Sequence, residues 1–305
     1  MKRFLLILSL IVSLKASAQD KDLFFQLPII PDTLTTLQDR CDYMVTHYWD
    51  FCDTKKAFSS RDKMAQAFNV YLSFMPYASA QTVTESVGKF MKRIEKQPAD
   101  VLFIGELAEG NLYSDTAEFQ SDALYLQFAE AVVRNKKVNK DSKLRFQHQI
   151  NILGKSQIGM IAPAFEYIDR QGDTHAFEPD TACMANILFF NDPDCSDCNM
   201  ARLRLDADIK TNRLIEEGVV KIFGITPGEP SPEWTEYAAR YPQTWTVGVS
   251  PQVDETYDLR TSPAFYVLDS KGKIILKHSD INVILNIMSQ LRVPKKQRDD
   301  AVTAE

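Results

Sequence analysis

Two cysteines, Cys195 and Cys198, come just after an apolar run and open a segment with helical spacing. The run, Ile187 to Phe190, has the length and composition of a buried strand. A cysteine at the start of a helix meets unpaired backbone N–H groups and the positive end of the helix dipole, and both stabilise a thiolate. The order strand, Cys-x-x-Cys, helix therefore predicts a redox-active dithiol on an α/β scaffold.

Two other interpretations of the cysteine pair stay open. A purely structural disulfide between Cys195 and Cys198 would close a loop of four residues. Such a loop contributes only about 2 kcal/mol, less than the roughly 3 kcal/mol of a 15-residue loop. A zinc site would need two further ligands at suitable spacing, and the sequence has no second C-x-x-C and no H-x-x-x-H. Redox chemistry is the interpretation we favour.

The first half of the chain has a helical pattern. From Pro31 to about Lys155 the apolar residues recur three and four positions apart, which predicts amphipathic helices. With 305 residues the chain is long enough for two domains, and we expect residues 19–155 to form an all-α N-terminal domain. Helices are expected over 32–50, 60–78, 114–135 and 141–154, with N-caps at Asp32 or Thr33, Ser60, Thr82 and Ser114.

Beyond Gly159 the pattern changes to a period of two and to short apolar runs. This change predicts a second domain over residues 156–292. We expect strands over 165–168, 185–190, 219–225, 245–249, 264–268 and 273–277, and helices over 195–217, 233–241 and 280–291, with a turn of helix near 254–259. Strand, helix and strand followed by a hairpin predict a mixed sheet covered on both faces. Residues 293–305 are charged and are expected to form a flexible tail.

Pro263 stands at the start of the expected strand over 264–268. Proline lacks a backbone N–H, so a strand tolerates it only at its first position or at a sheet edge. The Ser262–Pro263 bond is a candidate cis peptide bond.

The residues around the cysteine pair and around Pro263 resemble those of a known protein family. Phe189 to Cys198, Thr261 to Phe265 and Ala162 to Phe165 are similar to exported thioredoxin-like proteins of the TlpA/ResA and AhpC-TSA type. The resemblance covers roughly residues 156 to 292. It implies a thioredoxin-like fold in which Cys195 attacks, Cys198 resolves, and the loop at Pro263 faces the pair and holds the substrate chain. We expect Ser262 and Pro263 to present backbone groups to the bound polypeptide, and we expect no organic cofactor.

The N-terminal part carries a second, weaker resemblance. Pro31 to Leu34 and His47 to Asp50 resemble an uncharacterised helical domain that often precedes such thioredoxin-like domains. This resemblance implies no activity. His47, Trp49, Asp50 and Asp53 could suggest a metal or sugar site, but the interleaved aromatic residues favour an aromatic core beside a polar helix end.

Three aspartates, Asp192, Asp194 and Asp197, surround the cysteine pair and oppose formation of a thiolate. Peroxiredoxins of the resembled family carry a threonine where this chain has Asp192, so peroxidase activity is disfavoured. Phe189 replaces the buried acid of thioredoxin. We therefore expect a redox potential nearer the reducing thioredoxin end, about −270 mV, than the oxidising end, about −120 mV.

The N-terminus has the pattern of an export signal. A basic start, Met1 to Arg3, precedes the apolar stretch Phe4 to Leu14 and the small residues Ala16 to Ala18. The apolar stretch is shorter than the roughly 20 apolar residues that a membrane span needs, so we expect cleavage after Ala18. An uncleaved anchor is the alternative. The exported chain is expected to be periplasmic, or exported elsewhere, without stable membrane insertion.

The charge of the chain argues against nucleic acid as a partner. The formal net charge is −6, and loss of the three positive residues in the first 18 makes the exported chain more acidic still. An acidic protein offers no basic field to a phosphate backbone. Expected partners are thiols or disulfides of other exported proteins and an unidentified electron donor.

The remaining cysteines are interpreted as ordinary. Cys41 and Cys52, eleven residues apart, would be separated by about 16 Å on one helix, so they could pair only if the helix ended before Cys52. Cys183 is expected to be a small buried residue. The sequence as a whole predicts an exported thiol-disulfide oxidoreductase that reduces or isomerises disulfides. The alternative is a non-catalytic binding or assembly protein with a thioredoxin-like scaffold.

Overall fold

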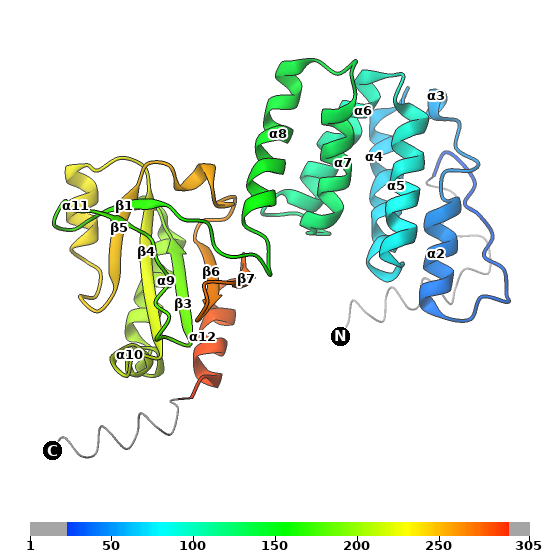
Figure 1. Cartoon of the computed structure of the whole chain (residues 1–305). Helices are drawn as coiled ribbons and strands as arrows, with labels where there is room; N and C mark the ends of the chain where they lie inside the picture. Colours follow the sequence, from blue (N-terminus) through cyan, green and yellow to red (C-terminus); the bar gives the residue numbers. More distant parts are fainter. Residues whose placement is uncertain (1–22, 293–305) are drawn as a thin grey trace. The chain divides into compact units, whose positions relative to one another are not determined.

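The computed structural model describes residues 23–292, and the chain divides after Ile150 into two compact units (Figure 1). Each unit is described by itself. The predicted export signal, residues 1–18, and the predicted tail, residues 293–305, lie outside the described residues.

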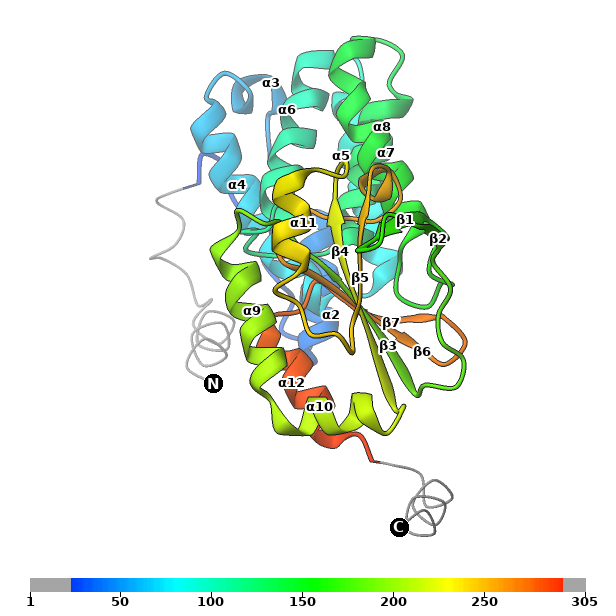
Figure 2. The same cartoon turned by 90° about the vertical axis from the view of Figure 1, so that its left-hand side faces the viewer.

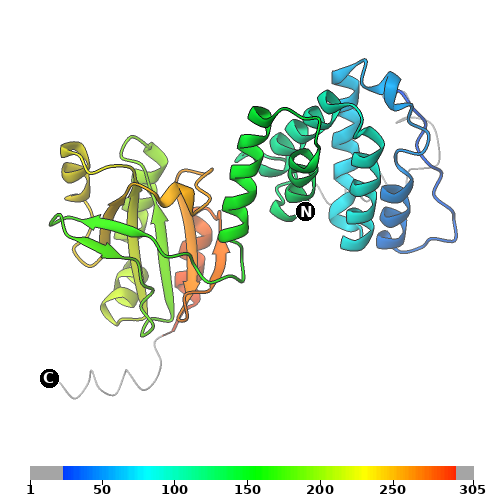
Figure 3. The same ribbon diagram turned by 45° about the horizontal axis from the view of Figure 1, so that its top comes forward.

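The first unit is helical, as the spacing of its apolar residues predicts. Helix α5 packs against α2 and α7, and α6 packs against α7 (Figures 1 and 3). A π-helical turn, η2, extends α6, and the last helix, α8, runs across the boundary between the units. The helices are α2 Leu37–His47, α3 Thr54–Ala57, α4 Arg61–Phe74, η1 Met75–Tyr77, α5 Ala80–Ile94, α6 Pro98–Ala108, η2 Glu109–Tyr113, α7 Asp122–Arg134 and α8 Lys140–Lys155.

Aromatic side chains fill the core of this unit. Trp49 stacks on Phe90 with ring centroids 4.3 Å apart, and Tyr48 and Tyr71 pack beside them, all buried. His47, at the end of α2, is half exposed and contacts Asp50 at 2.7 Å. This segment is thus an aromatic core next to a polar helix end. No group of metal-binding side chains occurs between residues 23 and 292.

The predicted starts of three helices were wrong, and the cause is the same in each. At these three helices the side-chain oxygen of the N-cap residue accepts a hydrogen bond from the backbone N–H three residues later, and several residues able to do so precede each helix. Ser60 is the N-cap of α4, as predicted. The N-caps of the other three helices differ from the prediction. Helix α2 is capped by Thr36 and not by Asp32 or Thr33, α5 by Ser79 and not by Thr82, and α7 by Ser121 and not by Ser114.

The second unit is a seven-stranded mixed sheet flanked by helices, with strand order β2-β1-β5-β4-β3-β6-β7 (Figure 1). Strands β3, β4 and β5 are parallel, and the remaining pairs are antiparallel. The strands are β1 Glu166–Asp169, β2 Thr174–Ala176, β3 Ala185–Phe190, β4 Val220–Pro227, β5 Thr246–Ser250, β6 Ala264–Asp269 and β7 Ile274–Lys277. The helices are α9 Ser196–Ala207, α10 Ile209–Glu216, α11 Pro232–Ala238, the short η3 Val253–Glu255 and α12 Ile281–Gln290.

The two faces of the sheet are covered differently. One face buries its side chains against α9, α10, α11 and α12, of which α9, α10 and α12 also contact one another (Figure 2). The other face packs against Phe165, Phe177, Val253 and Tyr257, which lie mostly in loops. Strand β2 was not predicted, because its three residues are all exposed and carry no apolar alternation.

The segment after Cys195 was predicted as one helix ending at Glu217, and the structure corrects this. Asp208 has an extended backbone between α9 and α10, and its side chain accepts a hydrogen bond from Thr211 N at 2.7 Å. This side chain caps α10, so the chain changes direction where the apolar spacing alone indicated continuity.

Candidate active site

The cysteine pair follows strand β3 and lies at the end of the sheet where this strand stops. All six residues of β3 are buried, and the chain leaves the strand through a short loop before α9 begins. Cys195 is the N-cap of α9, and its sulfur accepts a hydrogen bond from the backbone N–H of Cys198 at 3.0 Å. Cys195 is half-buried, whereas Cys198, one turn further on, is fully buried.

The loop before the helix is fixed by a buried amide. Asn191 donates from Nδ2 to the carbonyl oxygens of Phe189 and Ile225, at 3.0 and 3.2 Å, and accepts from the hydroxyl of Thr226 at 3.1 Å. Because these contacts join the ends of β3 and β4, Asn191 holds the position from which the chain turns toward Cys195. Asn191 was not predicted as a site residue, although a polar residue directly after a buried strand is a usable signal.

Cys195 and Cys198 form a disulfide with Cα atoms 5.2 Å apart, within the usual range for bonded cysteines. The other cysteines, Cys41, Cys52 and Cys183, are free and buried. Helix α2 ends at His47, before Cys52, yet Cys41 and Cys52 do not pair.

Burial also makes the free thiols poor nucleophiles. It raises the pKa of Cys52 to about 11 and raises the pKa values of Cys41 and Cys183 as well. A thiol whose pKa is raised holds less thiolate at neutral pH, and the thiolate is the reactive form. Thiol chemistry in the described part of the chain is therefore concentrated at Cys195 and Cys198.

The predicted proline loop lies against the disulfide. The Ser262–Pro263 bond is cis. The sulfur of Cys195 lies 3.7 Å from the carbonyl oxygen of Ser262, and the sulfur of Cys198 lies 3.2 Å from the Ser262 hydroxyl. The register of the sheet explains this meeting, because Phe190 at the end of β3 pairs with Ala264 at the start of β6.

The surroundings of the pair are apolar beneath and acidic above. Phe189 is fully buried and stacks on Phe265 with centroids 4.9 Å apart, and both rings belong to the apolar core that also contains Cys198. Asp192, Asp194 and Asp197 are exposed around the pair. The carbonyl oxygen of Asp192 accepts a hydrogen bond from Cys195 N at 3.1 Å, which ties the first cysteine to its loop.

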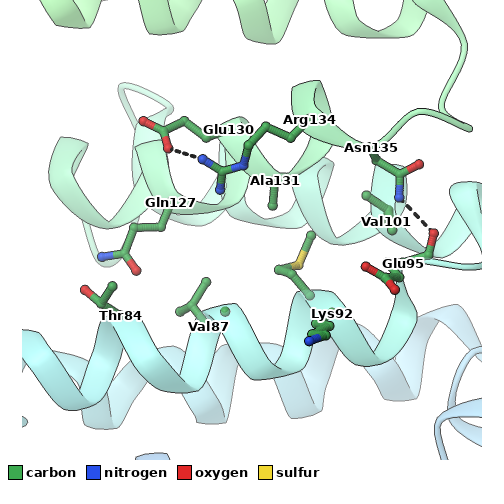
Figure 4. A pocket seen from close by; sticks show the side chains of 12 residues that line it. Thr84, Val87, Lys92, Glu95, Val101, Gln127, Glu130, Ala131, Arg134 and Asn135 are labelled. Carbon is green, nitrogen blue, oxygen red and sulfur yellow. Dashed lines mark hydrogen bonds and ion pairs between the residues drawn. The ribbon is translucent and has the colours of Figure 1, made fainter.

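The helical unit has a cavity of about 520 Å³, and no cysteine is among the residues that line it. Helices α5, α6 and α7 line it, and Arg134 and Glu130 form an ion pair at 2.8 Å on its wall (Figure 4). Apolar side chains, among them Val87 and Met91, mix there with charged ones. With no cysteine or other activated nucleophile in its lining, the cavity is a candidate binding surface only.

A helix-capping cysteine, a second cysteine one turn later and a cis-proline loop against both define the second unit as thioredoxin-like. The chain resembles the crystal structure of a thioredoxin-like protein from Bacteroides caccae, with a TM-score of 0.75 and 22% identity over 88% of this chain and 99% of that one. This likeness confirms the predicted fold. Residues 11–156 match a family model described as a domain of unknown function (DUF5106).

Two further solved structures align with less than half of this chain. A conserved protein of unknown function from Bacteroides fragilis has 29% identity over 44% of this chain and 99% of its own, with a TM-score of 0.41. The thioredoxin domain of a thiol-disulfide oxidoreductase from Bacteroides vulgatus has 19% identity over 44% of this chain and 99% of its own, with a TM-score of 0.37. No curated protein matches the sequence. Between residues 23 and 292, none of the helices combines the length and apolar character that a membrane span requires.

Proposed function

We propose that this chain is an exported thiol-disulfide oxidoreductase that reduces or isomerises disulfides of other exported proteins. The observation that carries the proposal is the Cys195–Cys198 disulfide at the start of α9, with the Ser262–Pro263 loop in contact with both sulfurs. We assign residues 1–18 to the export signal, 19–155 to the helical domain, 156–292 to the catalytic domain and 293–305 to the tail.

The reaction transfers two electrons from the dithiol to a substrate disulfide. The Cys195 thiolate attacks one sulfur of the substrate, so a Cys195–substrate bond forms, the substrate disulfide breaks and one substrate thiolate leaves. The Cys198 thiolate then attacks the Cys195 sulfur, which forms the Cys195–Cys198 disulfide and releases the second substrate thiolate. A dithiol reductant must return the pair to its reduced form before the next cycle.

The geometry fits this division of roles. Cys195 is the accessible member of the pair and faces the unpaired N–H groups at the start of α9, which favour its thiolate. Cys198 is buried beneath it, where only an intramolecular attack reaches. The backbone of Ser262 and Pro263, beside the Cys195 sulfur, would pair with an extended substrate segment as a strand edge does.

Reduction of insulin tests the proposal. With dithiothreitol as the electron donor, the wild-type protein should precipitate insulin faster than dithiothreitol alone, and Cys195→Ser should fall to that background. Cys183→Ser is the matched control, since Cys183 is a buried free cysteine in the same unit and its loss should leave turnover unchanged. Equal turnover by wild type and Cys195→Ser would favour the alternative, a binding or assembly protein that uses the helical unit for recognition.

A further inference from the structure

A cluster of charged side chains lies buried next to the proline loop. Asp258 is 1% exposed, and its Oδ2 lies 2.8 Å from Nη2 of Arg260 and 3.1 Å from Nε2 of His278. Burial acts to raise the pKa of Asp258, but His278, Arg260 and Lys277 outweigh it, so the pKa lies below its ordinary value. The group is therefore an ionised carboxylate held inside the domain by cationic neighbours.

The backbone of Asp258 is also fixed to the sheet. The hydroxyl of Tyr266, on β6, accepts a hydrogen bond from Asp258 N and donates one to Asp258 O, each at 3.0 Å. The neighbouring Tyr257 donates its hydroxyl hydrogen to Pro163 O at 2.7 Å. The segment that leads into the loop is thus anchored on both sides before it reaches Thr261.

Thr261 connects the cluster to the loop. Its hydroxyl lies 3.4 Å from Nδ1 of His278, the ring whose other nitrogen faces Asp258. A threonine hydroxyl both donates and accepts hydrogen bonds, so it can pair with Nδ1 of His278 whichever ring nitrogen carries the hydrogen. Thr261 precedes Ser262, so a continuous series of contacts runs from Asp258 to the sulfur of Cys198.

The backbone of His278 supports a positioning role. It follows β7 with φ of 51°, in the left-handed region that residues other than glycine seldom occupy. Its backbone N–H bonds to the carbonyl oxygen of Phe265 at 3.1 Å. Residues in such conformations persist where their surroundings hold them, and they gather at functional sites.

We propose that Asp258 and His278 are positioning residues that hold Thr261, and through it the Ser262–Pro263 loop, at the spacing from Cys195 that a bound polypeptide requires. This inference rests on the proposed function. It assigns the cluster to recognition of the substrate chain, since neither residue contacts the reacting sulfurs. Loosening the cluster should therefore impair reaction with a polypeptide disulfide and spare reaction with a small disulfide that has no backbone to pair with the loop.

Thr261→Val tests this with little change in volume, and Thr261→Ser is the conservative rescue. The pre-reduced protein is mixed with insulin or with hydroxyethyl disulfide, and oxidation of the cysteine pair is followed by mass. For Thr261→Val we expect the insulin rate at limiting substrate to fall about tenfold, with the hydroxyethyl disulfide rate within about twofold of wild type. Thr261→Ser should restore the insulin rate, and His278→Asn, which suits the left-handed backbone, should resemble Thr261→Val.

The matched control is Thr211→Val. Thr211 likewise bonds a neighbouring side chain through its hydroxyl, which donates to Asp208, but it lies on α10, beyond the far end of α9 from Cys195. Both of its rates should stay at the wild-type value. Equal losses for both disulfides in Thr261→Val, or no loss for either, would overturn the positioning role.

Hydrogen exchange at the backbone amides of Ser262 and Ala264 tests the same proposal without turnover. We expect exchange about tenfold faster in Thr261→Val than in wild type or Thr211→Val, because loss of one hydrogen bond lets the loop open more often. Unchanged exchange would refute the proposal on its own. A wild-type protein inactive toward both disulfides, but with exchange that responds to Thr261→Val, would refute the proposed function and leave the loop restraint in place.

Discussion

The hydroxyl of Ser262 lies 3.2 Å from the sulfur of Cys198, although 64 residues separate them in the sequence. In the disulfide the sulfur has no hydrogen, so the hydroxyl is the donor. In the dithiol the Cys198 sulfur is either a thiol, which can also donate to this hydroxyl, or a thiolate, which is a charged acceptor, and both bond the hydroxyl more strongly than a disulfide sulfur does. Ser262 therefore stabilises the reduced pair more than the oxidised pair.

Ser262→Ala should make the redox potential more negative. Removing a contact that favours the reduced state by about 1 kcal/mol shifts a two-electron couple by roughly 20 mV. Equilibration with glutathione buffers, read out by mass, measures the shift. The control is Ser250→Ala on β5, whose buried hydroxyl donates to Glu166 O at 2.6 Å and should leave the potential unchanged. A shift to a more positive potential in Ser262→Ala would contradict the argument.

Asp197→Asn should increase the reactivity of Cys195. Asp197 lies in the first turn of α9, two residues after the cysteine, where its negative charge opposes a thiolate. A like charge at about 6 Å costs roughly 0.7 kcal/mol in water, so its removal should raise the rate of iodoacetamide alkylation at pH 7 about threefold. The measurement uses the protein with Cys198→Ser, in which Cys195 cannot form the internal disulfide.

Asp206→Asn provides the matched control for this charge effect. Asp206 is an exposed aspartate on the same helix, but at the opposite end, about 16 Å from Cys195 along the axis. Added salt should shrink the effect of Asp197→Asn, because exposed charges are screened. A rate that rises equally in both variants would mean that net charge, and not the position of Asp197, sets the reactivity.

The sequence predicted the order of strands and helices around the disulfide because those segments carry strong patterns. The run over 187–190 is apolar throughout, and the structure places β3 over 185–190, the residues of the predicted strand. Pro263 could be identified as the start of a strand because a strand tolerates proline only at its first position or at a sheet edge. Both signals are local, so no knowledge of the remaining fold was needed to read them.

The parts that escaped prediction depend on contacts between distant residues. Asp258, Arg260 and His278 look like solvated polar residues in the sequence, and only the pairing of β6 with β7 brings His278 back to Asp258. The break at Asp208 escaped for a related reason, since an aspartate inside an amphipathic pattern is also compatible with a continuous helix. Helices and strands can be predicted from the local sequence pattern, whereas the positions of buried polar side chains become known only from the tertiary structure.

Asp258→Asn should reduce stability more at neutral pH than in acid. The folded-state pKa of Asp258 lies below its ordinary value, so the carboxylate contributes stability that is fully present above the unfolded pKa, about 3.9. That contribution is lost as the pH falls through the lower folded-state pKa. Removing the carboxylate from its buried ion pair with Arg260 should cost about 3 kcal/mol at pH 7. Urea unfolding at pH 7 and at pH 3 measures the difference.

The free energies of unfolding of wild type and Asp258→Asn should begin to converge as the pH falls below the unfolded pKa of about 3.9, because the unfolded carboxylate takes up a proton there and the advantage of the wild type shrinks toward the lower folded-state pKa. Asp206→Asn again serves as the control, since substitution of an exposed residue usually changes stability by less than about 0.5 kcal/mol. A gap between wild type and Asp258→Asn that is equally wide at both pH values would show that lost packing, and not the charge, destabilises the variant.

Cys198→Ser should capture the natural partners of the protein. Without the buried second thiol, the mixed disulfide between Cys195 and a substrate has no internal nucleophile to resolve it, so it accumulates. Expressed with its own N-terminal segment, this variant should give covalent complexes on non-reducing gels that disappear on reduction, and mass spectrometry of the partners should identify exported proteins with disulfides. The double variant Cys195→Ser/Cys198→Ser should give none, because the buried Cys41, Cys52 and Cys183 do not reach a partner. Complexes that persist in the double variant would mean that another thiol makes them, and an absence of complexes from Cys198→Ser would favour the non-catalytic alternative.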